Sequence, residues 1–137
     1  MQHNKQTKFV MYVDNFLDEA TLKSLQETFQ KINYNGVKNP EGKLYGHRHT
    51  FPKSFHDDPL IKLIKQYFFP HRNLEPISVS AHLRENNKEP LFHTDDDKGN
   101  VANFLLFVKG ETLLNNGTGF MNNNQLSSHI GFVENRA

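Results

Sequence analysis

The first third of the chain combines a short apolar run with one amphipathic segment. Residues 8–13 are β-branched and aromatic, which predicts a short strand. Asp18 is a typical N-cap residue and predicts a helix that continues to about Gln30. Apolar residues at helical spacing form one stripe on this segment, at Leu22, Leu25, Phe29 and Ile32. The stripe is expected to pack on the core.

A loop and a second helix follow. Residues 33–42 are rich in Asn, Gly and Pro and predict a loop, whereas residues 44–51 read as extended. Asp58 followed by Pro59 is a helix start, because an N-cap residue precedes a proline at the first helical position. The broad apolar face that begins there stops at Pro70, which predicts the end of the helix.

The pattern changes from helical to β at Pro76. Apolar and polar residues alternate from Ile77 to Arg84, which predicts a half-buried strand with a period of two. Residues 85–88 read as a turn, and a second strand begins at Leu91 and ends with His93 and Asp95.

The remaining residues predict more short strands separated by turns. Residues 101–108 are strongly apolar and predict a buried strand. Asn115-Asn116-Gly117 is a strong turn signal, and residues 118–121 and 127–133 are the last two strand candidates. Short strands at fairly regular spacing favour an antiparallel sandwich or jelly roll.

The sequence therefore predicts an α+β fold. One domain would span residues 1–137, with a helical part to about residue 75 and a jelly-roll part from about residue 76. The two N-terminal helices are expected to pack on the jelly roll.

Composition narrows the class of protein. The net charge is +1, from 16 basic and 15 acidic residues, which gives no argument for nucleic acid or an anionic membrane. There is no cysteine, so disulfides, thiolate metal sites and cysteine nucleophiles are excluded. No apolar run approaches the roughly 18 residues of a membrane span, and the N-terminus has no signal core. A soluble cytoplasmic protein is the default expectation.

The candidate chemistry lies at His93 and Asp95. Residues i and i+2 of a strand point to the same face, so the imidazole and the carboxylate would project side by side. Together they make two thirds of the two-His-one-carboxylate triad that binds non-haem Fe(II). The alternative is a surface histidine beside an acidic turn, in which residues 95–97 serve as turn residues.

The chain from Ile77 onward resembles the 2-oxoglutarate- and Fe(II)-dependent dioxygenases, in particular the prolyl-4-hydroxylase-like group of bacteria and phages. Phe92-His93-Thr94-Asp95 matches the H-x-D motif of that family. The strand ending at Leu83-Arg84, the run from Asn103 to Val108 and the segments 116–119 and 130–133 resemble its jelly-roll strands. The opening residues 13–17, followed by a helix, also look like its N-terminal region.

The resemblance implies a double-stranded β-helix fold, Fe(II) held by His93 and Asp95, and 2-oxoglutarate as co-substrate. It implies oxidative decarboxylation of 2-oxoglutarate to succinate coupled to hydroxylation of a C–H bond. Members of the family supply a second histidine from a later strand, and an Arg or Lys about ten residues beyond it binds the distal carboxylate of the co-substrate.

The chain departs from this pattern after its metal motif. His129 is the only histidine that follows His93. It is either a strand residue or a substitute third ligand, and Arg136 is either a co-substrate anchor or a solvated terminal arginine. The pattern leads us to expect an incomplete domain that lacks the distal histidine and the cation for 2-oxoglutarate. The sequence leaves open whether the last strand or strands are missing and whether this chain is active. A missing strand would expose a sheet edge, through which two copies could pair as a homodimer.

Other residues leave further alternatives. His47 and His49 lie at i and i+2 and are either a metal pair or surface or cleft histidines. His82 shares a face with Ser80 and Arg84 and either lines a substrate cleft or is buried and hydrogen-bonded.

Two other classes of protein compete with the oxygenase. A non-catalytic jelly-roll module would bind a ligand or Ca²⁺ through residues 95–97 and Asn100. A cupin-type metalloenzyme would want more histidines near His93. The substrate, small molecule or peptide, has no readable code in the sequence.

Overall fold

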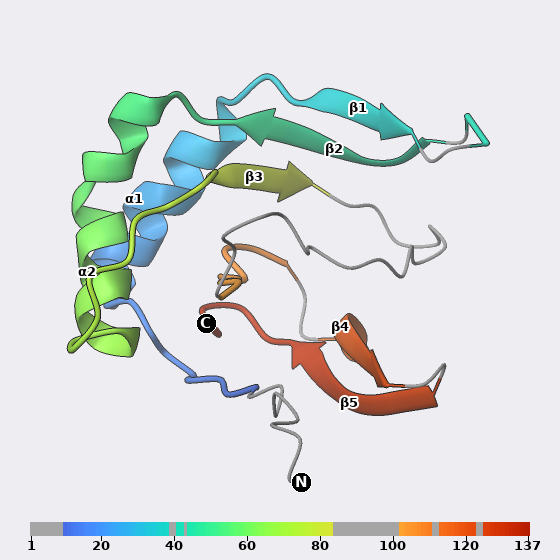
Figure 1. Cartoon of the computed structure of the whole chain (residues 1–137). Helices are drawn as coiled ribbons and strands as arrows, with labels where there is room; N and C mark the ends of the chain where they lie inside the picture. The colour runs from blue at the N-terminus through green and yellow to red at the C-terminus, as the bar shows by residue number, and fades with distance from the viewer. Residues whose placement is uncertain (1–9, 39–40, 43, 84–101, 111–112, 123–124) are drawn as a thin grey trace, which may run out of the picture. The chain divides into compact units, whose positions relative to one another are not determined.

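The computed structural model describes residues 10–38, 41–42, 44–83, 102–110, 113–122 and 125–137 (Figure 1). These residues form two α-helices, a short 3₁₀-helix and two small antiparallel sheets, which confirms the α+β class. The jelly roll stays a prediction. The chain divides into two compact units, one made of residues 1–28 and 102–137 and the other of residues 29–101.

Helix α1, Glu19–Gln30, begins where the sequence predicts. The Asp18 carboxylate accepts a hydrogen bond from the Thr21 backbone N–H at 2.7 Å, and the Asp18 carbonyl accepts one from Leu22 N–H at 2.9 Å. Asp18 is therefore the N-cap. The hydrogen bonds from Thr21 lower the pKa of the Asp18 carboxyl below its usual value of 3.8.

One side of α1 is half-buried, as the apolar stripe predicts, at Leu22, Leu25, Gln26 and Phe29. The polar member of this face, Gln26, bonds to residues 108 and 134 of the same unit. The Gln26 amide donates to the Val108 carbonyl at 2.8 Å and to the Glu134 carboxylate at 2.9 Å. A helix with few fully buried side chains is thus tied down by side-chain hydrogen bonds.

A three-stranded antiparallel sheet belongs to unit 29–101 (Figure 1). Its strands are β1 (Asn35–Lys38), β2 (Leu44–Thr50) and β3 (Ser80–Leu83), in the order β1-β2-β3. The strands at residues 44–51 and 77–84 are confirmed in position, although β3 is shorter than predicted. The loop predicted at residues 33–42 is wrong for β1, because pairing with β2 outweighs its turn-like composition.

Helix α2, Pro59–Phe68, also begins and ends as predicted. The Asp58 side chain accepts a hydrogen bond from Leu60 N–H at 2.9 Å, and Pro59 occupies the first turn. Ile61 is the buried residue of this helix, with 7% of its surface exposed. The short 3₁₀-helix η1, Lys53–Asp57, leads into it.

Aromatic rings join β2 to the elements around it in the same unit. The Phe51 ring stacks on Phe55 with centroids 4.2 Å apart and lies 5.9 Å from Phe29. His49 meets Phe51 edge to face at 5.0 Å. Ala81 on β3 is only 3% exposed, so it adds to the packed part of this unit.

The other sheet is a hairpin of β4 (Leu113–Asn122) and β5 (Gln125–Phe132). The turn predicted at Asn115-Asn116-Gly117 is wrong, because the strand continues through it. The register instead shifts between Leu113 and Gly117, which makes an irregularity in the ladder. Gly117 has φ of 109°, and a Cβ there would collide with the Ile130 carbonyl oxygen, so glycine is required.

The buried strand predicted at residues 101–108 is wrong for its described part. Residues 102–108 have no strand structure, and Leu105 is 52% exposed. Phe107 pairs through its backbone, donating to the Arg136 carbonyl at 2.9 Å and accepting from Asn135 N–H at 2.7 Å. These two hydrogen bonds join Phe107 to the C-terminal segment without forming a strand ladder.

The first predicted strand is also wrong for its described residues 10–13. Val13 exchanges two backbone hydrogen bonds with Ala137, at 2.8 and 2.9 Å, and Phe16 N–H donates to the Asn135 carbonyl at 3.0 Å. The C-terminal segment 133–137 thus has backbone partners in two segments, 13–16 and Phe107. Whether a sheet edge elsewhere pairs with a second copy stays a prediction.

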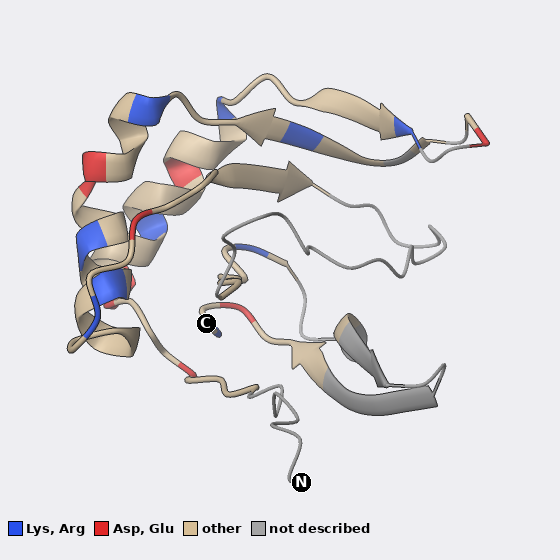
Figure 2. Ribbon diagram, viewed as in Figure 1, with Lys and Arg blue, Asp and Glu red and all other residues tan. Residues whose placement is uncertain are grey.

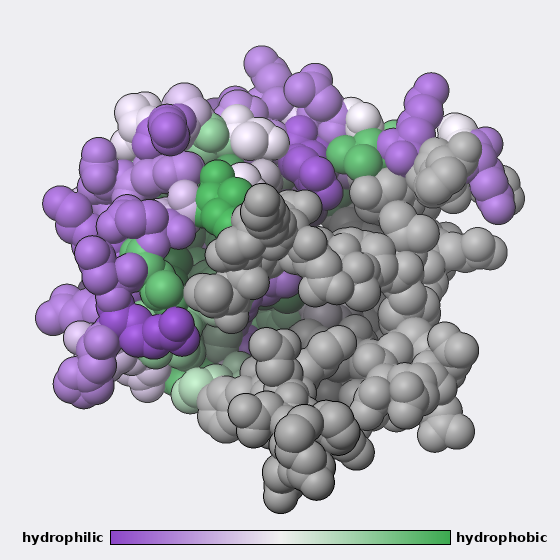
Figure 3. Space-filling model, viewed as in Figure 1, coloured by the Kyte–Doolittle hydropathy of each residue, from purple (hydrophilic) through white to green (hydrophobic). Residues whose placement is uncertain are grey.

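No helix in the described part of the chain has the length and apolar character needed to cross a membrane. In Figure 3 the hydrophobic residues on the coloured part of the surface form small separate patches among hydrophilic ones. The exposed apolar residues of unit 29–101 include Leu63, Tyr67 and Ile77, at 40%, 52% and 58% exposure.

Candidate functional site

The two predicted iron ligands, His93 and Asp95, lie within residues 84–101, outside the described part of the structure. Strand β3 ends at Leu83, upstream of both residues in the same unit. Their side-by-side geometry therefore stays a prediction from the i, i+2 spacing.

His129, the candidate third ligand, lies on β5 opposite Gly119 of β4. The predicted strand position is confirmed, because residues 127–132 are part of β5. Its role as a ligand stays a prediction. Among the residues that the structure describes, no three His, Asp or Glu side chains come together as a metal site.

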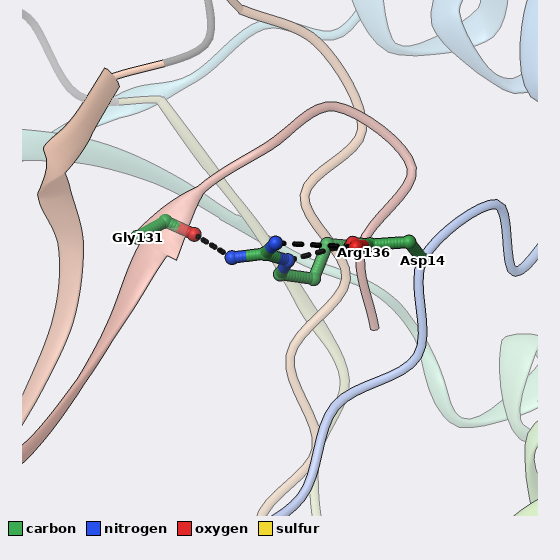
Figure 4. Close-up of polar contacts among 3 residues, drawn as sticks. All are labelled: Asp14, Gly131 and Arg136. Carbon is green, nitrogen blue, oxygen red and sulfur yellow. Dashed lines mark hydrogen bonds and ion pairs between the residues drawn. The ribbon is translucent and has the colours of Figure 1, made fainter.

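Arg136 is neither solvated nor available as a simple anion receptor. Its Nε donates to Asp14 Oδ1 at 2.7 Å and its Nη2 donates to Asp14 Oδ2 at 3.2 Å (Figure 4). The third nitrogen, Nη1, donates to the Gly131 carbonyl at 3.0 Å, and the guanidinium lies 4.2 Å from the centre of the Tyr12 ring. The side chain is 12% exposed, so the expectation of a solvated arginine is wrong.

The pair of Arg136 and Asp14 has an electrostatic signature. The hydrogen bonds from Arg136 lower the pKa of the Asp14 carboxyl below its usual value of 3.8, and those to Asp14 raise the pKa of Arg136. The Asp14 carboxylate occupies the edge of the guanidinium formed by Nε and Nη2, where a second carboxylate would otherwise bind in the same two-point manner. No local signal could have revealed this pair, because the two residues lie at opposite ends of the sequence.

Asn135 is a second polar cross-link that the sequence did not reveal. It is 6% exposed and adopts φ of 66°, in the left-handed region that asparagine tolerates better than most residues. Its Oδ1 accepts from Leu17 N–H at 2.9 Å and its Nδ2 donates to the Leu17 carbonyl at 2.7 Å. The side-chain amide thus makes the two backbone hydrogen bonds to Leu17 that a neighbouring strand would otherwise make. Leu17 is itself only 4% exposed.

His47 and His49 share one face of β2, as their spacing predicts, and both are half-buried. The Nδ1 atom of His47 is buried without a hydrogen-bond partner. The ring of His49 meets Phe51 edge to face. Whether the two histidines form a metal pair stays a prediction.

His82 lies on the opposite face of the sheet, directly across from Arg48 on β2. It is exposed, so the expectation that it is buried is wrong, and its partner Arg84 lies outside the described residues. The next pair on this face is Thr50 and Ser80, whose hydroxyl oxygens are 3.3 Å apart. The sequence predicted that Ser80 and His82 share one face of a strand. The pairing of β2 with β3 brings Arg48 and Thr50 onto the same face of the sheet, which the sequence did not reveal.

Comparison with known proteins gives no relative: no protein-family model, curated protein or solved structure matches this chain.

Proposed function

We propose that this chain is an Fe(II)- and 2-oxoglutarate-dependent oxygenase domain, a hydroxylase, with His93 and Asp95 as iron ligands. The observation that carries the proposal is the H-x-D spacing of these two residues, downstream of strand β3 in an α+β chain. The antiparallel sheets of the described chain are compatible with the double-stranded β-helix that the proposal requires.

The donor set suits the metal. An imidazole nitrogen and a carboxylate oxygen are two of the three ligands of the facial triad, and His129 is the one histidine that follows them in the sequence. Such a triad leaves positions open for other ligands. Iron bound there would supply activation of O₂ for attack on a C–H bond, and His93 and Asp95 would hold and orient it.

The proposal does not use Arg136 as the anchor for 2-oxoglutarate. Its guanidinium already has a carboxylate, a carbonyl and an aromatic ring as partners. An incoming dicarboxylate would have to displace Asp14, and the exchange of one carboxylate for another gives little net gain. The cation that binds the co-substrate is therefore left unassigned.

Anaerobic titration with Fe(II) and then 2-oxoglutarate tests the proposal. The parent protein should develop a weak visible absorption band when both are bound. His93→Ala and Asp95→Ala should weaken metal binding by at least about ten-fold, since each removes a direct ligand. His71→Ala is the matched control, because His71 is exposed beyond the end of α2.

Two results would overturn the proposal. The first is a parent protein that binds no Fe(II), and the second is His93→Ala binding as the parent does. His129→Ala then tests the third ligand separately, since it should weaken binding only if that imidazole coordinates the metal. Stabilisation by Ca²⁺ that Fe(II) and Mn²⁺ do not reproduce, and that Asp97→Asn abolishes, would point to a calcium-binding module instead.

A further inference from the structure

The exposed face of the β2–β3 ladder brings four hydrogen-bonding side chains into one block. Phe51 N–H donates to the Val79 carbonyl at 2.9 Å, so these residues form a hydrogen-bonded pair. Pairs alternate along an antiparallel ladder, which makes Thr50–Ser80 and Arg48–His82 non-hydrogen-bonded pairs. Side chains stand closest in pairs of this kind, and the 3.3 Å separation of the two hydroxyls agrees.

The block is accessible, and the described strands that carry it have no acidic residue. Arg48, Thr50 and His82 are exposed, and Ser80 is half-buried. Strands β1, β2 and β3 contain no Asp or Glu, as Figure 2 shows by the absence of red on them. Arg48 therefore gives the described part of this face a fixed positive charge.

Arg48 and Arg136 differ in the partners of their guanidinium groups. No ion pair or hydrogen bond joins its guanidinium to the described residues, whereas Arg136 is held by Asp14. His82 has an interaction of its own, and the permanently charged side chain of the block is Arg48. Since one of the Thr50 and Ser80 hydroxyls donates to the other, one O–H remains for a ligand.

We propose that Arg48, Thr50, Ser80 and His82 form a binding site for the phosphate group of a small phosphomonoester. The guanidinium supplies a planar pair of N–H donors that matches two phosphate oxygens, and the free hydroxyl supplies another donor. The Cα atoms of the block lie about 4.5 Å apart across the strands and about 7 Å apart along them, so the four side chains can reach one ligand group.

This face suits a single phosphate group better than the row of phosphates in a nucleic acid backbone. A nucleic acid is held by several cations spaced along its backbone, and the block offers one permanent cation. A monoester concentrates about −1.5 to −2 charges on a single group, so one arginine with hydroxyl donors can recognise it. The proposal concerns residues other than the iron ligands and does not depend on the proposed oxygenase activity.

Titration of the metal-free chain at constant ionic strength tests this site. The probes are inorganic phosphate and glycerol 3-phosphate, followed by amide chemical shifts in two-dimensional NMR. We expect saturable shifts at residues 48–50 and 80–82. Arg48→Gln should weaken binding by about ten-fold or more, since it removes the charge-assisted pair of hydrogen bonds. Arg48→Lys should have an affinity between those of the parent and Arg48→Gln, because it keeps the charge but lacks the planar pair of N–H donors.

The matched control is Arg72→Gln, which removes the same charge from an exposed position in the same unit. It should bind within about two-fold of the parent, because a remote surface charge contributes only screened attraction. Thr50→Val, which removes a hydroxyl at nearly constant shape, should weaken binding without altering the fold.

Three results would overturn the proposal: shifts that do not saturate, an equal loss in Arg72→Gln, or Thr50→Val and Arg48→Gln binding as the parent does. Tighter binding of a single-stranded oligonucleotide or an acidic peptide at the same residues would replace the phosphomonoester with that ligand class. Failure here leaves the iron titration unaffected, because His93 and Asp95 are not changed.

Discussion

Phenylalanine rings pack against one another in both compact units, but among the described residues only one unit is also cross-linked by polar side chains that bond to distant backbone. In unit 1–28/102–137, Asn135 substitutes for a strand beside Leu17, Arg136 clamps Asp14, and Gln26 fastens α1. In unit 29–101, Phe51 packs between Phe29 and Phe55. The comparison teaches that short irregular segments need hydrogen bonds from side chains, because such segments have few partners in strand ladders for their backbone N–H and C=O groups.

The largest effect is expected from Asn135→Ala. The change leaves the buried N–H and C=O of Leu17 without partners and places an alanine at φ of 66°. Each unsatisfied group costs about 1–3 kcal/mol and the backbone conformation about 1 kcal/mol more, so we expect a loss of about 3 kcal/mol in the free energy of unfolding. Urea denaturation measures it.

Two further variants sharpen this result. Asn135→Gly keeps the left-handed backbone without strain and should be about 1 kcal/mol more stable than Asn135→Ala. Asn73→Ala, at an exposed position of the other unit, should change stability by less than about 0.5 kcal/mol. If Asn135→Ala matched Asn73→Ala, the cross-link to Leu17 would be unimportant.

Phe51→Ala tests the other side of the comparison. It removes the ring that meets Phe29, Phe55 and His49, so we expect a loss of about 2 kcal/mol, less than for a fully buried ring because Phe51 is half-buried. Phe51→Leu keeps most of the apolar volume and should lose less than about 1.5 kcal/mol.

Hydrogen exchange resolved by peptide shows which unit each change loosens. Phe51→Ala should speed exchange mainly in residues 29–83, and Asn135→Ala mainly in residues 10–28 and 102–137. Equal acceleration in both units from both variants would mean that the chain opens as one body, and the distinction between the units would fail.

A smaller effect is expected at the cap of α2. Asp58→Ala removes the acceptor for Leu60 N–H and should cost about 1 kcal/mol of stability. Asp57→Ala is the matched control, because this neighbouring aspartate is exposed and has no part in the cap. Thermal unfolding followed by circular dichroism compares the two, and similar melting temperatures would contradict the assignment of Asp58 as cap.

The smallest effect is the pH dependence of the Arg136–Asp14 clamp. The pKa of Asp14 is lower in the folded chain than its usual 3.8, so the carboxylate stabilises the fold above that value. The contribution is lost as the pH falls through the folded-state pKa, and the chain should become less stable in acid. Asp14 is 44% exposed, so screening by solvent keeps the effect modest.

Urea midpoints measured between about pH 5 and pH 2 test the clamp, because that window brackets the titration of an aspartate. Asp14→Asn should flatten the acid part of the profile. Glu75→Gln, which breaks the pair with Lys65 in the other unit, should change it less, because Glu75 is 70% exposed. A profile that is the same for Asp14→Asn and the parent would show that the clamp contributes nothing to stability.

Elements with strong local signals were predictable. Asp18 with the stripe of Leu22 and Phe29, and Asp58 followed by Pro59, define both helices within a few residues of sequence. The hydrogen bonds that start a helix come from residues next to each other in the chain, so the sequence alone contains them.

Elements whose partners are distant were not predictable in the same way. Strand β1 has a loop-like composition, β4 runs through an Asn-Asn-Gly turn signal, and residues 102–108 are apolar without being a strand. In each case the state of the segment depends on which other segment supplies its hydrogen bonds.

The candidate sites divide in the same manner. The sequence by itself determined that His93 and Asp95 have the spacing of metal ligands, because the two-residue period of a strand is a local property. Only the tertiary structure decided that Arg136 is bound to Asp14, that Asn135 replaces a strand beside Leu17, and that Arg48 stands open beside His82. Such pairs form between distant residues, and the chain specifies them only when it is folded.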